Sequence, residues 1–412
     1  MNVLVRNASM LITCAGDSRP RAGASANDLA IIRQGSVVVR DGRIAWVGED
    51  RHLPAGLAEC READAGGMVV TPGLVDCHTH ALFAGSRAGE FAMRVAGATY
   101  EQIMAEGGGI SASARMLREA PDGDIVDQTV GRLRRMLRLG TTTCEIKSGY
   151  GLSTDQELRS LRLIRQTSHR VPMSIVPTFM GAHALPPPWR HDRAGFIDMV
   201  VHEMLPRVAD EKLARFCDVF CERGAFTVDE SRRVLEAARG HGMGLKIHAD
   251  ELAGSGGTRL GAELGVCSAD HLLRATREDL QALRDSGAIA VILPGTCLGL
   301  GKTAFAPGRM MVEIGLPVAI ASDLNPGNCY CENLPLMVTL ACLYGGLSIE
   351  EALIGVTVNA AHALGLAREV GSLEVGKRGD LVIWDIDDYR EIAYHFGVQL
   401  ARTVIVGGAH SD

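Results

Sequence analysis

The stretch Gly73-Leu74-Val75-Asp76-Cys77-His78-Thr79-His80 decides the fold of this 412-residue chain. Its apolar run, Gly73–Thr79, is followed by amphipathic segments of helical length, and this alternation continues to about Leu364. Such a pattern predicts βα units and a parallel sheet of the α/β class. Seven further runs share the character of the first: Thr142–Lys147, Met173–Met180, Cys217–Glu222, Leu245–His248, Cys267–His271, Ile289–Leu293 and Pro317–Asp323. Eight parallel strands close a barrel, so we predict a (β/α)8 TIM barrel over residues 69–364.

Three helix starts support this count. Ser153, Thr227 and Ser348 each place a hydroxyl three residues before an acid or an amide. This spacing is typical of a capped helix N-terminus. We therefore expect a helix to begin directly after each of these residues.

Both ends of the chain differ from the middle. Strand-like runs lie at Val3–Thr13, Ser36–Gly48, Asp380–Trp384 and Thr403–Val406. Asp41-Gly42 predicts a hairpin turn within the second run. Because these segments flank the barrel, we predict that residues 1–68 and 365–412 meet in one small composite β-sandwich domain.

Composition limits the classes of function. The net charge is −7, from 42 basic and 49 acidic residues, and there is no block of Lys and Arg. Nucleic acid is therefore a poor candidate partner. No apolar run is long enough to span a membrane, and Met1–Cys14 lacks the features of a signal peptide. These observations predict a cytoplasmic protein with no membrane partner.

The eleven cysteines predict reduced thiols, since the chain is long and no export signal is visible. The pairs Cys217/Cys221 and Cys329/Cys331 lack the spacing of a structural zinc knuckle. We interpret them as small core residues.

Polar side chains follow several predicted strands at their carboxyl ends: His78, His80, His183, His248, His271 and Asp323. In a parallel barrel these ends meet at one mouth, where active sites form. His78 and His80 share a face because alternate residues of a strand point the same way. Neutral imidazoles suit both zinc and iron. The set therefore predicts one metal ion at the mouth, although a lone His-x-His pattern would be weak evidence.

The surrounding acids suggest hydrolytic chemistry. A metal with an open position lowers the pKa of a bound water to about 7. Asp323 is a candidate acceptor for the water proton, and Glu251, three residues after His248, for delivering a proton to the leaving nitrogen. His271 is a candidate for polarising the attacked carbonyl. The alternatives are a helix N-cap for Asp323 and an ordinary helix-start acid for Glu251.

These motifs resemble the amidohydrolase superfamily. Its signs are Pro72–His80, the split β domain and the segment Gly371–Asp380. Within the superfamily, the chain resembles the imidazolonepropionases, the ring-opening enzymes of histidine breakdown. The more specific motifs are Phe83–Arg87, Glu145–Leu152, Gly181–Ala184, His248–Glu251, Ser268–His271 and Asp323–Gly327.

The resemblance implies hydrolysis of a cyclic amide, 4-imidazolone-5-propanoate, to N-formimidoyl-L-glutamate in histidine degradation, with metal-activated water as the nucleophile. It implies a homodimer and one divalent or trivalent zinc or iron ion. The implied metal ligands are His78, His80, His248 and Asp323. The implied catalytic residues are Glu251, His271 and Asp323. The implied substrate contacts are Arg87, Tyr150, His183, Glu251, His271, Asn325, Gly327 and Asn328.

Two positions depart from the family pattern. Asn328 stands where a small hydroxyl residue is expected, which puts the local substrate contact in doubt but not the metal site. Cys77 replaces the more usual Pro, and we expect no consequence.

Two side chains fit a small substrate with a carboxylate tail. Arg87 offers a planar fork for a carboxylate, and Tyr150 can add a hydroxyl hydrogen bond. The alternative for Arg87 is a surface salt bridge. Lys147 could suggest a carboxylated lysine that bridges two metals, as in hydantoinase-like relatives. That lysine ends the fourth strand, however, and here the strand ends Phe220-Cys221-Glu222, so we predict one metal and a structural ion pair for Lys147.

Two alternatives remain open. An aromatic-base deaminase of the cytosine or guanine type also uses a His with a Glu three residues later, but a neutral base has no carboxylate for Arg87 to hold. Ring opening releases no ammonia, whereas deamination does. A non-catalytic metal-binding barrel would be expected to lack ligands, and every expected ligand is present here.

Overall fold

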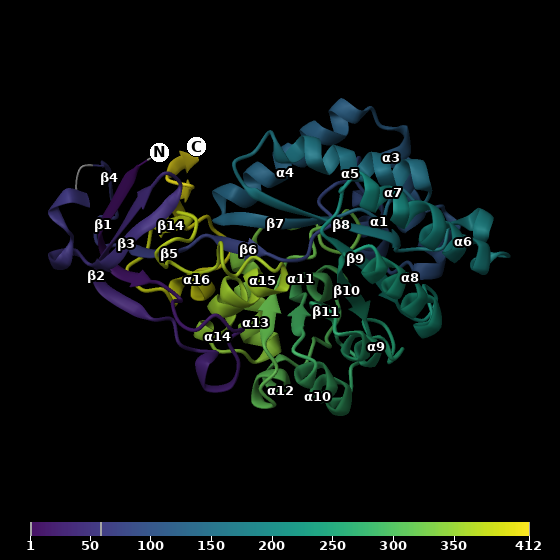
Figure 1. Ribbon diagram of the computed structural model, residues 1–412. Helices are drawn as coiled ribbons and strands as arrows, with labels where there is room; N and C mark the ends of the chain where they lie inside the picture. The colour runs from purple at the N-terminus through teal and green to yellow at the C-terminus, as the bar shows by residue number, and fades with distance from the viewer. Residues whose placement is uncertain (1, 58–59, 412) are drawn as a thin grey trace.

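The structure, a computed structural model, describes residues 2–57 and 60–411 and contains two β-rich parts. A parallel barrel wrapped by helices fills one side of Figure 1. A second sheet fills the other side, where the purple N-terminal strands lie beside the yellow C-terminal segment. Both termini lie in this second part, as predicted.

The barrel contains all eight predicted strands. They are β6 (Leu74–Asp76), β7 (Thr141–Lys147), β8 (Ser174–Ala182), β9 (Phe216–Cys221), β10 (Gly244–Ala249), β11 (Ser268–His271), β12 (Ile289–Ile292) and β13 (Val318–Ile320). Each pairs in parallel with the next along the chain. The residues that follow β13 and β6 close the ring through a parallel bridge between Thr79 and Leu324. The His80 N–H donates to the Leu324 carbonyl at 2.8 Å across this seam.

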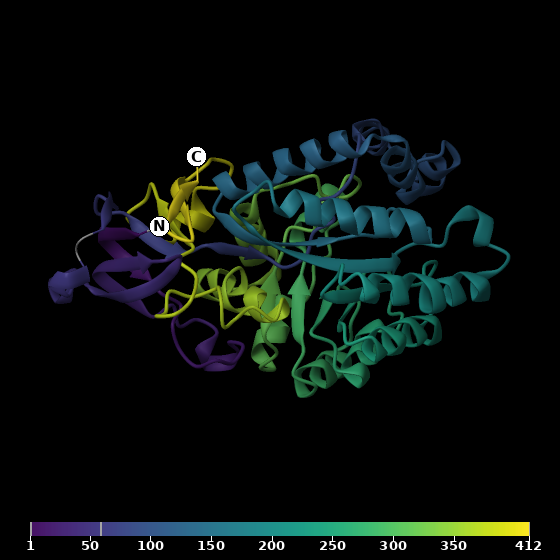
Figure 2. The same cartoon turned by 45° about the horizontal axis from the view of Figure 1, so that its top comes forward.

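Helices surround the barrel and follow its strands, as Figure 2 shows for those along its upper side. The α-helices are α1 (Ala88–Val95), α2 (Tyr100–Ala105), α3 (Ile110–Glu119), α4 (Asp122–Arg138), α5 (Thr154–Ser168), α6 (Arg193–Met199), α7 (Leu205–Asp210), α8 (Val228–Gly240), α9 (Gly257–Leu264), α10 (Arg277–Asp285), α11 (Pro294–Gly299), α12 (Gly308–Glu313), α13 (Leu334–Gly345), α14 (Ile349–Gly355), α15 (Val358–Ala363) and α16 (Glu391–Tyr394). Shorter helical turns are η1 (Gly23–Ser25), η2 (Asp50–His52), η3 (Ala55–Leu57), η4 (Pro187–Trp189) and η5 (Val200–Met204). Within the described ranges, no helix combines the length and the apolar character that a membrane span requires.

Two of the three predicted helix caps are confirmed. Thr227 and Ser348 form capping boxes, with hydroxyl oxygens that accept the N–H groups of Glu230 and Glu351. A helix also begins after Ser153, but the predicted cap there is wrong, because its side chain makes no capping hydrogen bond. The amide of Gln156, the expected partner, instead accepts a hydrogen bond from an arginine one turn later in α5.

The terminal segments form the predicted composite β domain. Its strands are β1 (Val3–Ile12), β2 (Ile31–Arg40), β3 (Arg43–Glu49), β4 (Arg61–Asp64), β5 (Val69–Pro72), β14 (Leu381–Trp384), β15 (Ala401–Val406) and β16 (Ala409–Ser411). They belong to one connected sheet of order β16-β15-β14-β5-β1-β2-β3, with β4 paired to β1. Ile44 of β3 and Ile405 of β15, from opposite ends of this path, pack in the same apolar core. The sheet therefore folds over itself, and its two halves enclose the core as the layers of a sandwich do.

The predicted hairpin turn at Asp41-Gly42 is confirmed by the backbone angles of these two residues. Asp41 and Gly42 have φ values of 50° and 80°, as a tight turn between β2 and β3 requires.

We propose that the chain forms two units, one of residues 1–68 with 365–412 and one of residues 69–364. β5 is shared between them, because it pairs with β1 and β14 and leads directly into β6.

Candidate metal centre and active site

Four imidazoles and one carboxylate meet at the carboxyl ends of the barrel strands: His78, His80, His248, His271 and Asp323. Each residue is at most 4% exposed. Oδ1 of Asp323 lies 3.5 Å from Nε2 of His78 and 3.8 Å from Nε2 of His80. Nε2 of His80 lies 3.4 Å from Nε2 of His248. Barrel closure therefore brings together residues that are up to 245 positions apart in the sequence.

The ring nitrogens of this cluster fit a metal ion. Nε2 of His78 is buried and has no hydrogen-bond partner in the structure. Burial holds the pKa of His78 and of His80 well below the usual value, and lowers the pKa of His248 to about 3. The imidazoles are therefore neutral at physiological pH, and each has a ring nitrogen with a free lone pair that can bind a metal. A cation among them would satisfy these otherwise unpaired atoms.

Carboxylates beneath the cluster orient two of the imidazoles. Oδ2 of Asp270 lies 2.6 Å from Nδ1 of His78, and Oδ1 of Asp218 lies 3.1 Å from Nδ1 of His248. An Nδ1–H that donates to a carboxylate leaves Nε2 free as the metal-facing atom. Lys147 in turn lies 2.7 Å from Asp218, which confirms its predicted role in an ion pair.

A layer of charged side chains fills the barrel interior below the mouth. Nζ of Lys147 lies 2.8 Å from Oε2 of Glu145, and Nζ of Lys246 lies 2.9 Å from the same oxygen. We name the five residues of this group, none of which is exposed, the interior network: Glu145, Lys147, Asp218, Lys246 and Asp270. The sequence predicted an ion pair for Lys147 but none of the other pairings. A signal was available, since Lys246 precedes the candidate ligand His248 by two residues and therefore shares its face of the strand.

Local backbone and hydrogen bonds fix Asp323. Its φ is 51°, a left-handed conformation that a non-glycine residue adopts at some energetic cost. The Thr296 hydroxyl donates to Oδ2, and burial raises the pKa of the Asp323 carboxyl. Oδ1 consequently remains to face the histidines. Thr296 lies in the first turn of α11, and no pattern near it in the sequence predicts this contact.

Glu251 lies beside the cluster, next to His271. Oε2 of Glu251 is 3.8 Å from Nε2 of His271, and Oε1 is 4.0 Å from Nζ of Lys302. The His271 ring centroid is 5.1 Å from that of His248. His271 also has a left-handed φ of 78°. The structure therefore brings a second acid, Glu251, to the cluster, within reach of the same small molecule.

His183 and Tyr150 form an aromatic wall next to His80. The rings of His183 and His80 stack with a centroid distance of 4.9 Å. Nδ1 of His183 lies 3.0 Å from the Gly149 carbonyl, and burial lowers the pKa of His183 to about 4. The ring is thus neutral, with Nδ1–H donating and Nε2 available as an acceptor. Burial raises the pKa of Tyr150, so its hydroxyl stays protonated and can donate.

The loop that carries Tyr150 is held by a buried acid. Glu157 accepts hydrogen bonds from the N–H groups of Gly149, Gly151 and Leu152 at 2.7 to 3.0 Å. Gly149 has a φ of 109°, and a Cβ there would lie 2.8 Å from Nδ1 of His183. Glycine at this position therefore permits the close approach of the His183 ring.

Arg87 is already engaged within the chain. Its Nε and Nη2 donate to the two carboxylate oxygens of Glu90 at 2.9 and 2.7 Å. Its Nη1 lies against Gly327, where a Cβ would come within 2.2 Å. Nη1 also donates a long hydrogen bond, 3.5 Å, to the Ser113 hydroxyl. Two of the three guanidinium nitrogens are thus bound by Glu90, and Nη1 is the least engaged. The sequence places Glu90 three residues after Arg87, but it does not show whether Arg87 binds Glu90 or a substrate carboxylate.

Asn325, Gly327 and Asn328 form one turn. The Asn325 side-chain oxygen accepts the N–H groups of Gly327 at 2.9 Å and Asn328 at 2.7 Å. Arg87, Gly327 and Asn328 line a cavity of about 330 Å³. The amide oxygen of Asn325 is consequently used to shape the loop, and the side chain of Asn328 borders the open space.

Comparisons with known proteins agree with this geometry. The model of the amidohydrolase family matches residues 69–409. An imidazolonepropionase from Geobacillus kaustophilus is 47% identical over 98% of this chain and 97% of its own length. Another, from Symbiobacterium thermophilum, is 48% identical over 99% of this chain and 96% of its own length.

Solved structures share the fold at lower identity. An atrazine chlorohydrolase from Arthrobacter aurescens, complexed with zinc, has a TM-score of 0.76 and 18% identity over 99% of this chain and 94% of its own. An adenosine deaminase from Xanthomonas campestris with bound zinc has a TM-score of 0.71 and 19% identity, over 99% of this chain and 92% of its own. These likenesses concern the fold alone. The full-length matches and the family model show that the chain belongs to the amidohydrolase family and, within it, to the imidazolonepropionases.

Proposed function

We propose that this protein opens the ring of 4-imidazolone-5-propanoate by hydrolysis and yields N-formimidoyl-L-glutamate, a step of histidine degradation. The observation that carries the proposal is the buried cluster of unpaired imidazole nitrogens beside Asp323, in a chain 47% identical throughout to an imidazolonepropionase. Cluster and identity together favour ring opening over deamination and over a non-catalytic barrel.

We propose that His78, His80, His248 and Asp323 hold one zinc or iron ion. Three imidazoles and a carboxylate are donors that both metals accept. When bound, such an ion lowers the pKa of a coordinated water to about 7 and so supplies a nucleophile at neutral pH. Elemental analysis of the purified protein distinguishes the two metals.

Asp323 is the proposed first proton acceptor. Its carboxyl is buried next to the proposed metal ligands His78 and His80. The Thr296 hydroxyl holds Oδ2, and so Oδ1 is the atom that faces the reacting centre. The remaining oxygen is therefore positioned by the chain before substrate arrives.

Glu251 and His271 are the proposed partners of the substrate ring. Oε2 of Glu251 and Nε2 of His271 are 3.8 Å apart, so a substrate nitrogen can contact Glu251 while the adjacent carbonyl contacts His271. We assign Glu251 to proton delivery at the leaving nitrogen and His271 to polarisation of the carbonyl. Both are at most 7% exposed, which keeps bulk water away from these hydrogen bonds.

The remaining proposed contacts bind the flat ring and its carboxylate tail. Arg87 and Tyr150 are proposed to hold the tail, with Nη1 of Arg87 as the contacting edge. His183 is proposed to accept a hydrogen bond through Nε2. Asn325, Gly327 and Asn328 are proposed to border the substrate, with only Asn328 offering a free side-chain amide.

The decisive experiment is an absorbance assay on freshly prepared imidazolone propionate with the metal-loaded protein, combined with product identification and an ammonia assay. The expected result is loss of the substrate absorbance, formation of N-formimidoyl-L-glutamate and no ammonia. Stoichiometric ammonia release would instead support the deaminase, and absence of any turnover with both zinc and iron would refute ring opening.

A homodimer and a cytoplasmic location remain predictions. Three side chains near α16 are exposed although apolar, Tyr394 at 81%, Phe396 at 60% and Val398 at 47%. Exposed apolar groups of this size are a feature of subunit contacts. Light scattering on the purified protein tests the expected mass of two chains.

A further inference from the structure

A second cavity, of about 630 Å³, lies away from the mouth of the barrel. Three separate segments and Arg43 of β3 line it; the segments are residues 14–21, residues 358–370 and residues 372–377. The first and the third belong to the terminal parts of the chain, and the second contains α15. The cavity therefore lies where the β domain meets the barrel.

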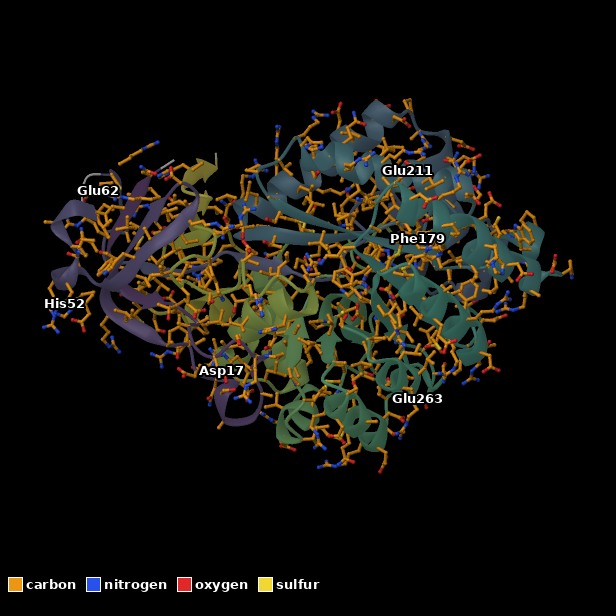
Figure 3. All side chains as sticks on the ribbon, in the orientation of Figure 1. Asp17, His52, Glu62, Phe179, Glu211 and Glu263 are labelled. Atoms are coloured by element: carbon orange, nitrogen blue, oxygen red, sulfur yellow. The ribbon has the colours of Figure 1, made fainter. Side chains whose placement is uncertain are left out.

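Its position relative to the strands excludes a contribution to the active site. Nδ2 of Asn359 donates both to the Val318 carbonyl at 2.8 Å and to the Arg21 carbonyl at 2.9 Å. Val318 begins β13, whereas Asp323 follows the carboxyl end of that strand. The cavity is thus at the amino-end face of the barrel, and Figure 3 shows Asp17 on the loop beside it, far from Phe179 of β8.

Arg21 is the unusual residue of this cavity. It is only 5% exposed, yet its guanidinium donates no hydrogen bond within the described residues, and Nε is completely buried. The nearest carboxylate, on Asp17, is 3.9 Å away and is itself bound by Arg19 at 2.8 Å. The one carboxylate near Arg21 is thus beyond hydrogen-bond distance, and a buried arginine with five N–H donors and no hydrogen bond to any of them is costly.

Gly16 makes room for this guanidinium. A Cβ at position 16 would lie 1.8 Å from Nη2 and 2.4 Å from Nη1 of Arg21. Glycine therefore lets the planar group rest against the backbone of a residue that also lines the cavity. Any side chain at position 16 would displace the guanidinium from this place.

The other charges of the cavity leave a positive excess. Arg43 is paired with Glu369 at 3.0 Å, and Lys377 with Glu374 at 2.9 Å. Every acid that lines the cavity therefore has a basic partner. Arg368 also lines it and has no ion pair within the part of the chain that the structure describes. Arg21 and Arg368 are consequently the two cations available to a ligand.

We propose that this cavity binds a small anion through a carboxylate or phosphate group, with the Arg21 guanidinium as its principal contact. The planar fork of arginine matches both groups through paired N–H donors. Because the cavity joins the β domain to α15, the bound anion connects two parts of the chain and stabilises the folded protein. The substrate of the mouth is not involved.

Thermal unfolding and calorimetric titration of the metal-loaded protein test this proposal. Inorganic phosphate and succinate are titrated separately at constant ionic strength, with chloride as the reference salt. We expect at least one of them to bind saturably and to raise Tm by about 2 to 5 °C. The anion that does so identifies the preferred head group.

Two variants make the result specific. Arg21→Met removes the charge and Gly16→Ala displaces the guanidinium, and both are expected to abolish the saturable shift. Arg51→Gln, an exposed arginine of the β domain, is the matched control and is expected to keep it. The proposal is overturned if neither anion binds saturably to the unmodified protein, or if the shift persists in both cavity variants. Turnover of all three variants is expected to stay within about twofold of the unmodified protein, because none of the three substituted residues contacts the active site.

Discussion

The mouth of the barrel and the interior network below it are both buried and polar, but their polar atoms are used differently. In the interior network, Lys147 and Lys246 lie within 2.9 Å of carboxylates, and every member has an ion-pair partner. At the mouth, Nε2 of His78 and Nδ1 of His271 have no hydrogen-bond partner within the described residues. Interior charges are neutralised within the chain, whereas the mouth presents unused lone pairs.

This difference separates groups that stabilise the fold from groups that act on a ligand. Asp218, His248 and Asp270 are close enough to hold a cation by distance alone. Lys147 already neutralises both carboxylates, however, so this group is a poorer metal site than the one at Asp323. Burial alone does not identify a functional residue, and the absence of a partner is the more informative property.

The largest expected effect is at the mouth. His248→Ala removes one proposed ligand and should abolish metal retention, with a loss in kcat/KM of more than about 1,000-fold. Elemental analysis and the ring-opening assay measure both quantities. His241→Ala, at the exposed end of α8, is the control and should behave as the unmodified protein. Full activity of His248→Ala after exhaustive chelation would contradict the proposed mechanism.

Removing a cation from the interior network should act on stability. Lys147→Met leaves Glu145, Asp218 and Asp270 without their shared partner, and should lower the free energy of unfolding by about 3 to 5 kcal/mol. Denaturant titration of the metal-free protein measures this. Lys212→Met, outside the network, should change it by less than about 0.5 kcal/mol. A loss below about 1 kcal/mol in Lys147→Met would mean that the network is not a stabilising unit.

One residue belongs to both regions and sharpens the comparison. Asp218→Asn keeps an acceptor for Nδ1–H of His248 but loses the charge, and should weaken metal affinity by about 10- to 100-fold. Competition with a chelator of known affinity measures the change, with the exposed Asp210→Asn as the control. Unaltered affinity would show that His248 does not need Asp218 to present Nε2.

The smallest expected effect is at the rim. Arg87→Lys keeps the charge but loses the planar fork, and should raise KM about tenfold while stability changes little. Steady-state kinetics and thermal unfolding give the two numbers, and Arg135→Lys, a surface ion-pair residue, is the control. Because Glu90 already binds two nitrogens of Arg87, an unchanged KM would assign this arginine to loop structure rather than to the substrate tail.

Local pattern determined the architecture. The apolar runs predicted all eight barrel strands, because the periodicity and the length of a strand depend on a few consecutive residues. The two terminal groups of strands were recognised for the same reason. The convergence of His78, His80, His248 and Asp323 also followed from sequence, since parallel strands in a barrel end at one face.

Pairing between distant side chains was decided only by the tertiary structure. Strand register and loop path decide that Asp218 and Asp270 share Lys147 as a partner, and that Glu90 binds Arg87. They also decide that the buried Arg21 guanidinium has no hydrogen bond within the described residues. Ser153 shows the same limit at short range, because the sequence showed a possible cap but not which hydrogen bond would form. A hydrogen bond requires atoms placed to within a few tenths of an ångström. Sequence pattern fixes which face a residue occupies, and only the folded chain fixes what it meets there.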